Sequence, residues 1–254
     1  MSVQALPRIS VIMTTFNGAE FIEQSIGSLR AEAGVDLDIV VVDDASTDGT
    51  LARLRDIGGR DPRVRVFAGE KRGIAGSRNA GLAEVRHELL TFLDQDDLCM
   101  PGRLARQAAL IERTPGIAAV MGETLLFQTL GPDRMPLPGT DTARVLGIQL
   151  SAGLFRTSAV RSLGFNTTFA MADDFDLILR LLEADHEIAV EREIATLHRR
   201  HAGNTSGNIA ALRLELLKVF QESLKRRRAA GRAGPIVHPL VASMSRVGSP
   251  LHAG

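Results

Sequence analysis

In the first hundred residues, short β-rich apolar runs alternate with segments of helical periodicity. The apolar runs cover residues 9–14, 38–43, 64–67 and 89–93, and the helical segments between them cover 20–32, 47–57 and 76–86. Repetition of strand, helix and strand is typical of a parallel sheet with right-handed crossover helices. The second and fourth runs are apolar enough to be buried on both sheet faces. The sequence therefore predicts an α/β fold with a mostly parallel sheet flanked by helices.

Polar residues follow three of these predicted strands. Thr14 to Asn17 lie at the end of the first, Asp43 and Asp44 at the end of the second, and Asp94 to Asp97 directly after the fourth. Ligands of open α/β sheets bind at the carboxyl ends of the strands. We therefore expect these segments to form the ligand-binding edge.

The segment 94–97 carries three carboxylates in four residues, at Asp94, Asp96 and Asp97. Carboxylates this close repel one another unless a cation, a proton or strong hydrogen bonds compensate. Mg²⁺ and similar ions bind one or two carboxylates together with the oxygens of a substrate diphosphate. The pattern thus favours a metal-assisted nucleotide site. The alternative is an acidic loop that caps a helix beginning near Pro101.

Charge and cysteine content narrow the class of protein. Lys plus Arg and Asp plus Glu each number 30, so no global field favours nucleic acid as a partner. The single cysteine, Cys99, excludes an internal disulfide and fits a reducing compartment. The sequence shows neither a signal-peptide pattern at its start nor an apolar run of about 18 residues. We expect a soluble, cytoplasmic protein.

The second half of the chain is less regular. Residues 131–139 form a breaker-rich loop that we expect to border an acceptor-facing region. The remaining predicted segments are an element at 155–163, a helix at 173–184, strands at 188–190 and 194–197, a polar loop at 201–208, a helix at 209–228 and a loosely ordered tail at 229–254.

Five motifs in order along the chain resemble the signatures of family 2 glycosyltransferases. They are residues 10–17, 42–50, 76–81, 92–97, and 173–177 with Arg180. The resemblance covers residues 8–207 and implies a Rossmann-like GT-A fold, a nucleoside-diphosphate sugar donor, a divalent metal ion and inversion at the anomeric carbon. It also implies a glycosyltransferase domain over 1–207, with a nucleotide-binding half at 8–115 and an acceptor-binding half at 116–207. A C-terminal helix at 208–228 and a flexible tail at 229–254 would follow.

The resemblance assigns the nucleoside and phosphate contacts to four residues. Asp44 would accept the imide N–H of uracil or thymine, and Thr14 and Asn17 would wall the nucleoside. Arg78 suits diphosphate or planar recognition because its guanidinium presents a rigid fork of donors. Alternatively, Asp44 caps the helix that starts near Thr47, and Arg78 is an exposed helical arginine in surface ion pairs.

Further residues are candidates for the metal and the diphosphate. By resemblance, Asp96 is the direct ligand of Mn²⁺ or Mg²⁺, and Asp94 meets the ribose or a metal-bound water. The polar loop adds His201, which would complete the metal sphere, and Arg200 or Arg199, which would neutralise phosphate. A structural or solvated role for His201 is the alternative.

Asp174 is the candidate general base of an inverting transfer, because a carboxylate within hydrogen-bond reach can take the proton of the acceptor hydroxyl. Asp173, where the family more often has Glu, is a candidate for orienting the acceptor. The alternative for both is that their charges stabilise a helix N-terminus by ~0.3–1 kcal/mol. Asp176 on the same turn supports that alternative.

The predicted helix at 209–228 is apolar on one face and ends in four consecutive basic residues, 225–228. It either packs on the domain or lies on an anionic membrane that contains a lipid-linked acceptor. In the second case the protein would be peripheral to the inner face of the membrane.

The sequence therefore predicts a metal-dependent inverting glycosyltransferase that uses a nucleoside-diphosphate sugar and a saccharide, lipid-linked or other hydroxyl acceptor in the synthesis of cell-surface glycans or glycoconjugates. A sugar nucleotidyltransferase is disfavoured because 14–18 lacks a basic, Gly-rich phosphate loop. A glycosidase needs only two carboxylates and no nucleotide site. A catalytically silent nucleotide-sugar binding module remains the alternative from another class.

Overall fold

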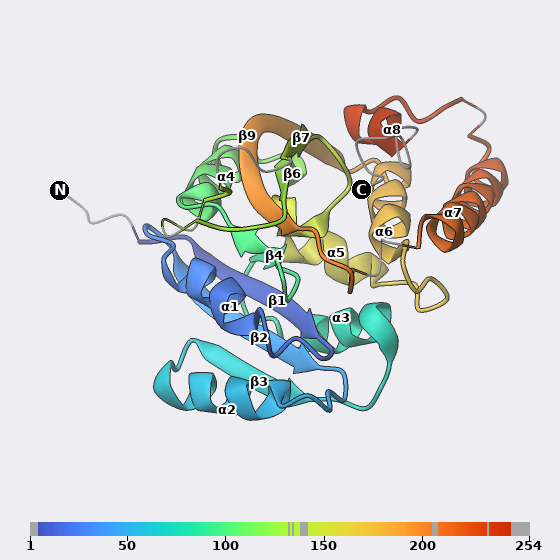
Figure 1. The fold of residues 1–254 in the computed structure, drawn as a ribbon. Coiled ribbons are helices and arrows are strands. Elements are labelled where there is room, and N and C mark those ends of the chain that lie inside the picture. Colours follow the sequence, from blue (N-terminus) through green and yellow to red (C-terminus); the bar gives the residue numbers. More distant parts are fainter. Residues whose placement is uncertain are drawn as a thin grey trace.

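A computed structural model describes residues 5–131, 133, 135–137, 142–204, 208–232 and 234–244. A single mixed sheet forms its centre, in the order β3-β2-β1-β4-β8-β6-β9-β5, with β7 paired to β6 (Figure 1). The strands are β1 (Arg8–Thr15), β2 (Asp36–Asp43), β3 (Val64–Ala68), β4 (Leu89–Phe92), β5 (Leu98–Cys99), β6 (Ile117–Phe127), β7 (Ala143–Val145), β8 (Gly153–Arg156) and β9 (Glu187–Arg199). The helices are α1 (Ile22–Arg30), α2 (Thr50–Arg60), α3 (Gly73–Glu84), α4 (Arg103–Arg113), α5 (Thr157–Leu163), α6 (Asp173–Glu183), α7 (Ile209–Ala229) and α8 (Pro239–Met244), with a 3-10 helix η1 (Leu150–Ala152).

The four strands predicted in the first hundred residues are confirmed as β1 to β4, and they are parallel to one another. Their connections are the predicted helices, α1 to α3. All residues of β2 after its first are buried, as its apolar sequence predicts. The α/β class follows directly from this repeated strand and helix pattern.

The second half of the sheet is mixed. Strand β8 runs antiparallel to both β4 and β6, whereas β6 and β9 are parallel. The two short strands predicted at 188–190 and 194–197 are one strand, β9, that continues through the polar residues between them. Register shifts along the β6–β9 pair absorb these extra residues, and sequence alternation cannot reveal such irregularities.

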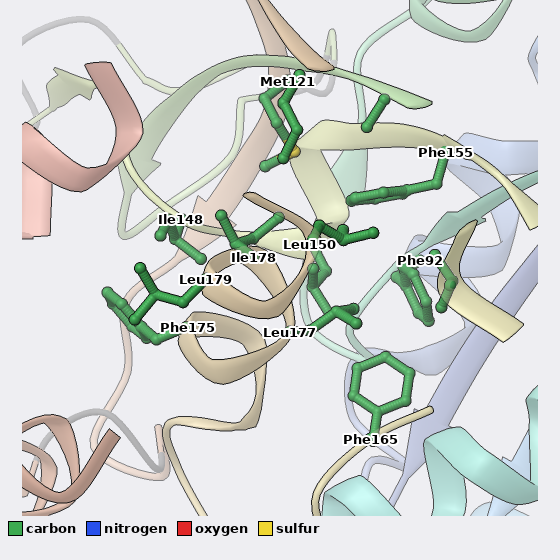
Figure 2. Close-up of a cluster of buried hydrophobic side chains, with 14 of the residues drawn as sticks. Phe92, Met121, Ile148, Leu150, Phe155, Phe165, Phe175, Leu177, Ile178 and Leu179 are labelled. Atoms are coloured by element: carbon green, nitrogen blue, oxygen red, sulfur yellow. The ribbon is translucent and has the colours of Figure 1, made fainter. Parts of the chain in front are cut away.

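Helices cover both faces of the sheet, and each face has its own core. Buried side chains of α1, α2 and α4 pack on one face, and those of α3, α5, α6, α7 and α8 pack on the other. In the second core Phe92 contacts two rings edge-on, with centroid distances of 5.8 Å to Phe155 and 5.5 Å to Phe165 (Figure 2). Leu177 and Ile178 bring α6 into this core, and burial of each such side chain contributes ~1.5–3 kcal/mol.

The C-terminal helices pack outside α6. Buried Leu212, Leu216 and Val219 of α7 belong to the same core as α6, so the packing alternative holds for this face of the helix. The predicted loosely ordered tail contains the short helix α8, and its Leu240 is fully buried in that core. This burial explains a helix in a segment whose composition favours disorder. Residues 245–254 of the predicted tail lie outside the described residues.

Within the described ranges, no helix combines the length and apolarity needed to cross a bilayer.

Candidate active site

Arg78 joins two of the predicted motifs. This buried side chain of α3 donates from Nη1 to Oδ2 of Asp173 at 2.8 Å and from Nη2 to Oδ1 of Asp94 at 3.1 Å. Burial opposes its charge, but the neighbouring carboxylates, Asp173 first, outweigh that cost and raise the pKa of Arg78 above its usual value. The exposed-helix alternative for Arg78 is therefore wrong. The acidic motif after β4 and the start of α6 meet through this one guanidinium.

Asp174 lies beside that ion pair, in the first turn of α6. Its Oδ1 accepts from the backbone N–H of Phe175 at 2.8 Å. Desolvation and the negative charge of Asp173 raise the pKa of Asp174 to about 8, and the attraction of Arg78 only partly offsets them. A carboxylate with a pKa of about 8 is a stronger base than an ordinary one, and it acts as a base in the fraction of the protein in which Asp174 is ionised. Asp173, in contrast, is buried against Arg78.

Asp96 pairs with His201 from the segment after β9. Nε2 of His201 lies 2.8 Å from Oδ2 of Asp96, and Nδ2 of Asn204 donates to the same oxygen at 3.2 Å. The His201 ring rests on Phe21, with centroids 4.7 Å apart. Burial and the adjacent charge of Asp97 raise the pKa of Asp96.

The Asp96–His201 pair can be tested as a metal site. Among the residues that the structure describes, no three His, Cys, Asp or Glu side chains gather to hold a metal ion alone. Mg²⁺ ligands about 2.1 Å from the ion lie about 3 Å apart at neighbouring octahedral corners. The 2.8 Å separation in the Asp96–His201 pair is close to that spacing. In this structure the contact is a hydrogen bond, and a carboxylate beside an imidazole has the donor chemistry that divalent ions such as Mn²⁺ take.

Asp97 has a different role from the rest of the acidic motif. Its fully buried carboxylate accepts from Ser151 Oγ at 3.2 Å and from the backbone N–H of Arg199 at 3.1 Å. His198 Nδ1 lies 3.0 Å from its Oδ1. Burial opposes the charge of His198, but Asp97 outweighs it and raises the pKa of His198 to about 9. Asp97 thus fixes the motif to η1 and β9.

The alternative that the acidic motif caps the following helix is wrong. The start of α4 is capped by Glu32, whose carboxylate accepts from the backbone N–H groups of Gly102 at 2.7 Å and Leu104 at 2.9 Å. The carboxylates of the motif point instead to Arg78, His201 and the β9 segment.

Asp44 at the end of β2 caps a helix other than the expected one. Its carboxylate accepts from the N–H groups of Arg72 at 2.8 Å and Gly73 at 3.0 Å, and from Ser77 Oγ at 2.7 Å. These donors belong to the N-terminus of α3, whereas Asp48 accepts from the N–H of Thr50 at the start of α2. The predicted base-reading residue therefore also fixes the β3–α3 loop.

The other predicted donor residues lie around the same edge. Asn17 has a left-handed backbone, with φ of 52°, and its Oδ1 accepts from the N–H of Thr47 at 2.8 Å. It thereby ties the loop after β1 to the loop after β2. Thr14 is half-buried near the end of β1, opposite Val42 of β2.

The two arginines after His198 differ in their surroundings. Arg199 is buried between the rings of Phe21 and Phe127, each 4.9 Å from its guanidinium carbon. Arg200 is half-buried, and its N–H donates to the carbonyl of Phe127 at 2.7 Å. Arg200 therefore remains the candidate for neutralising the charge of the donor phosphates. Residues 205–207 of the predicted polar loop lie outside the described residues.

The sequence interpretation missed two features of this edge. Phe16 is exposed directly after β1, and Nζ of Lys71 lies 4.9 Å from its ring centre. The signal was present, because an aromatic residue follows two threonines at the end of the first strand. Gln95 fixes this loop, accepting from Thr15 Oγ1 at 2.6 Å and from the N–H of Phe16 at 2.9 Å.

Comparison with known proteins places this geometry in context. The family model described as glycosyl transferase family 2 matches residues 10–153. The succinoglycan biosynthesis protein ExoO of Rhizobium meliloti is 28% identical over 251 residues, covering 90% of this chain and 71% of that protein. A GalNAc(5)-diNAcBac-PP-undecaprenol beta-1,3-glucosyltransferase of Campylobacter jejuni is 34% identical over 123 residues, 48% of this chain, and the chain spans only 39% of its length.

Solved structures share the fold at low sequence identity. The mannosyltransferase PcManGT of Pyrobaculum calidifontis, solved with GDP-Man and Mn²⁺, superposes with a TM-score of 0.71 at 19% identity, over 98% of this chain and 72% of that one. S. aureus TarS in complex with UDP-GlcNAc gives 0.58 at 20% identity, over 82% and 65%. These matches confirm the expected GT-A architecture.

Proposed function

The chain belongs to glycosyl transferase family 2, and we propose that it transfers a sugar from a nucleoside-diphosphate sugar, with UDP or dTDP as the nucleotide, to an acceptor hydroxyl. The observation that carries the proposal is the ion-pair chain Asp94–Arg78–Asp173. It joins the acidic motif, on the donor side, to the residue before Asp174. A direct transfer requires a donor site and a base that are held in fixed relative positions.

The nucleoside would lie over the ends of β1 and β2. A carboxylate has about four acceptor positions, and the α3 contacts of Asp44 take three of them, so an imide N–H of uracil or thymine has a place to bind. The exposed ring of Phe16 offers a stacking surface for the base. Thr14 and Asn17 wall the same space.

Asp96 and His201 would hold Mn²⁺ or Mg²⁺, which when bound neutralises the leaving diphosphate as a Lewis acid. A solved neighbour of the same fold contains Mn²⁺ beside its nucleotide sugar, which supports this choice of cofactor. Arg200 lies one residue before His201 and would add positive charge near the phosphates.

In the transfer, the acceptor oxygen forms a bond to the anomeric carbon while the bond from that carbon to the diphosphate oxygen breaks. The hydroxyl proton passes to Asp174, and the nucleoside diphosphate leaves with the bonding electrons. Attack from the face opposite the leaving group inverts the anomeric configuration. Arg78 would hold Asp173 in place. Through Asp173 it would also fix the position of the start of α6 relative to the donor.

We propose a saccharide or lipid-linked acceptor and a cytoplasmic enzyme that touches the inner face of a membrane. The relatives are named for glycan synthesis, and one name includes an undecaprenol-linked substrate. Helix α7 carries six Lys and Arg against two Glu, and it exposes Leu214, Leu217 and Leu224 to 62%, 59% and 46% on the side away from the core. An apolar strip with basic flanks suits an anionic lipid surface.

A thermal-shift screen of UDP-, dTDP- and GDP-sugars with and without Mn²⁺ tests the proposal, because a ligand that binds only the folded state raises the melting temperature. The donor that stabilises the protein in a Mn²⁺-dependent way should then release its nucleotide on incubation with the enzyme. Stabilisation without any nucleotide release would instead indicate a silent binding module. No stabilisation by any donor would contradict the proposal.

A further inference from the structure

One carboxylate of the C-terminal helix holds the segment that leads into α6. Glu215 of α7 accepts from the backbone N–H of Ala170 at 3.2 Å, of Met171 at 2.8 Å and of Ala172 at 3.0 Å. Ala172 is the N-cap residue of α6, and its side chain makes no capping hydrogen bond. Glu215 thus accepts from the N–H of the N-cap residue, as the N3 Glu or Gln of a capping box does, but it does so from another helix.

The position of this contact matters because Asp173 and Asp174 follow Ala172 directly. Three charge-assisted hydrogen bonds to one carboxylate fix the direction of the entering backbone. The same loop is fixed at its other end by Asn79 of α3, which donates to the carbonyl of Phe165 at 2.9 Å and accepts from its N–H at 2.8 Å. The start of α6 is therefore held between α3 on the donor side and α7 on the C-terminal side.

Docking of α7 does not depend on Glu215 alone. Arg226 donates to Glu183 at 2.6 Å and to Asp176 at 3.3 Å, and the buried leucines of α7 pack into the core of α6. A change at Glu215 should therefore leave α7 in place and release only the backbone at 170–172. This separation makes its contribution measurable.

We propose that Glu215 is a positioning residue for sugar transfer, which holds the start of α6 so that Asp174 faces the acceptor hydroxyl. The inference rests on the proposed function and extends it to a helix that follows the last residue matched by the family model. Glu215 itself does not touch the reacting atoms. Its contribution is to the geometry of the base and not to nucleotide binding.

The test compares Glu215→Ala and Glu215→Gln with Glu222→Gln, an exposed position on the same helix that pairs with Lys225. The measurements are the turnover number for nucleotide release from a panel of UDP-, dTDP- and GDP-sugars, and the Kd for UDP with Mn²⁺. A misplacement of about 1 Å can cost about 10²-fold in rate, so Glu215→Ala should lose ~10- to 100-fold in turnover. Glu215→Gln keeps one acceptor oxygen and should recover part of that loss, and Kd should stay unchanged in all variants.

Amide hydrogen exchange at residues 170–172 shows directly whether the backbone has been released, and it should speed up in Glu215→Ala. Faster exchange with unchanged turnover would overturn the positioning role, because the contact would then only hold the loop. A parallel loss of UDP binding would overturn it too, since the effect would be general. A wild-type protein that releases no nucleotide from any donor contradicts the proposed function itself, and with it the positioning role.

Discussion

Arg78 and Asp173 form a buried ion pair between residues 95 positions apart, with Nη1 of the arginine 2.8 Å from Oδ2 of the aspartate. The exposed fractions of the two side chains are 6% and 2%. Because neither charge has access to water, each depends on the other for its stability in the folded protein. This dependence makes the pair a structural link between the two ends of the active site.

Replacing Arg78 by Met should therefore destabilise the protein by about 3–5 kcal/mol, since Asp173 would be left as an unpaired buried charge. Urea unfolding measures this loss, and transfer should fall with it. Arg55, an exposed arginine of α2, provides the matched control, and Arg55→Met should be near neutral. Equal stability of the two variants would contradict the role given to Arg78.

Replacing Asp174 by Asn should lower transfer by ~10²–10⁴-fold, because the amide keeps the shape of the carboxylate but cannot take the acceptor proton. Nucleotide affinity should stay nearly unchanged, since Asp44, Arg78 and the metal pair remain. Steady-state kinetics and calorimetry with UDP and Mn²⁺ measure the two effects. Near-parental turnover would place the base elsewhere, and a collapse of nucleotide binding would make Asp174 a structural residue.

The raised pKa of Asp174 predicts how stability depends on pH. In the folded protein Asp174 has a pKa of about 8 and keeps its proton up to about that pH, whereas an ordinary Asp releases its proton near pH 3.8. Between these values the folded state binds more protons than the unfolded state, so this group lowers the free energy of unfolding as pH rises. The melting temperature of Asp174→Asn minus that of the wild type should therefore increase from pH 5 to pH 8.5. A constant difference across this range would show that the pKa is not raised.

Removing the metal pair should abolish the metal dependence of nucleotide binding. In Asp96→Ala and His201→Ala, calorimetry should show that Mn²⁺ no longer tightens the binding of UDP, because an ion held by one or two protein ligands loses much of its site when one is removed. Asp56, an exposed aspartate of α2, is the control. Full metal enhancement in Asp96→Ala would exclude this residue as a ligand.

The leucine strip of α7 predicts binding to anionic membranes. Cosedimentation should show binding to vesicles that contain phosphatidylglycerol and little binding to pure phosphatidylcholine, with loss at high salt. Leu217→Gln should weaken binding by ~10- to 100-fold, since burying a leucine contributes ~1.5–3 kcal/mol. Leu6→Gln, at another exposed leucine, is the control. Identical vesicle binding of the two variants would contradict a membrane contact through the exposed leucines of α7.

The strands and the acidic edge could be predicted because their signals are local. Apolar runs of the right length, spaced by helical segments, are sufficient to predict β1 to β4, and the topology of such units places Asp44 and Asp94 at one edge. Long-range pairings carry no such signal. Nothing in the sequence near Arg78 indicates that Asp173 is its partner, nor that Asp44 caps α3.

The irregular parts also resisted prediction for physical reasons. Strand β9 continues through polar residues because its pairing with β6 tolerates register shifts, which alternation patterns cannot show. Helix α8 forms in a segment rich in Gly, Pro and Ser because one buried leucine, Leu240, anchors it. Strand pairing in the first case, and burial against a distant core in the second, override local composition.

The shared core of α6, α7 and α8 has a consequence for the heat inactivation of the protein. Because Leu216, Leu240 and Leu177 belong to one buried cluster, we expect the helix that carries Asp174 and the C-terminal segment to open together. The strands β1 to β3 contribute mainly to the core on the opposite face. We therefore expect substitutions at Leu216 or Leu240, which no sequence motif marks, to lower the temperature of heat inactivation, because opening this cluster would displace the helix that carries Asp174.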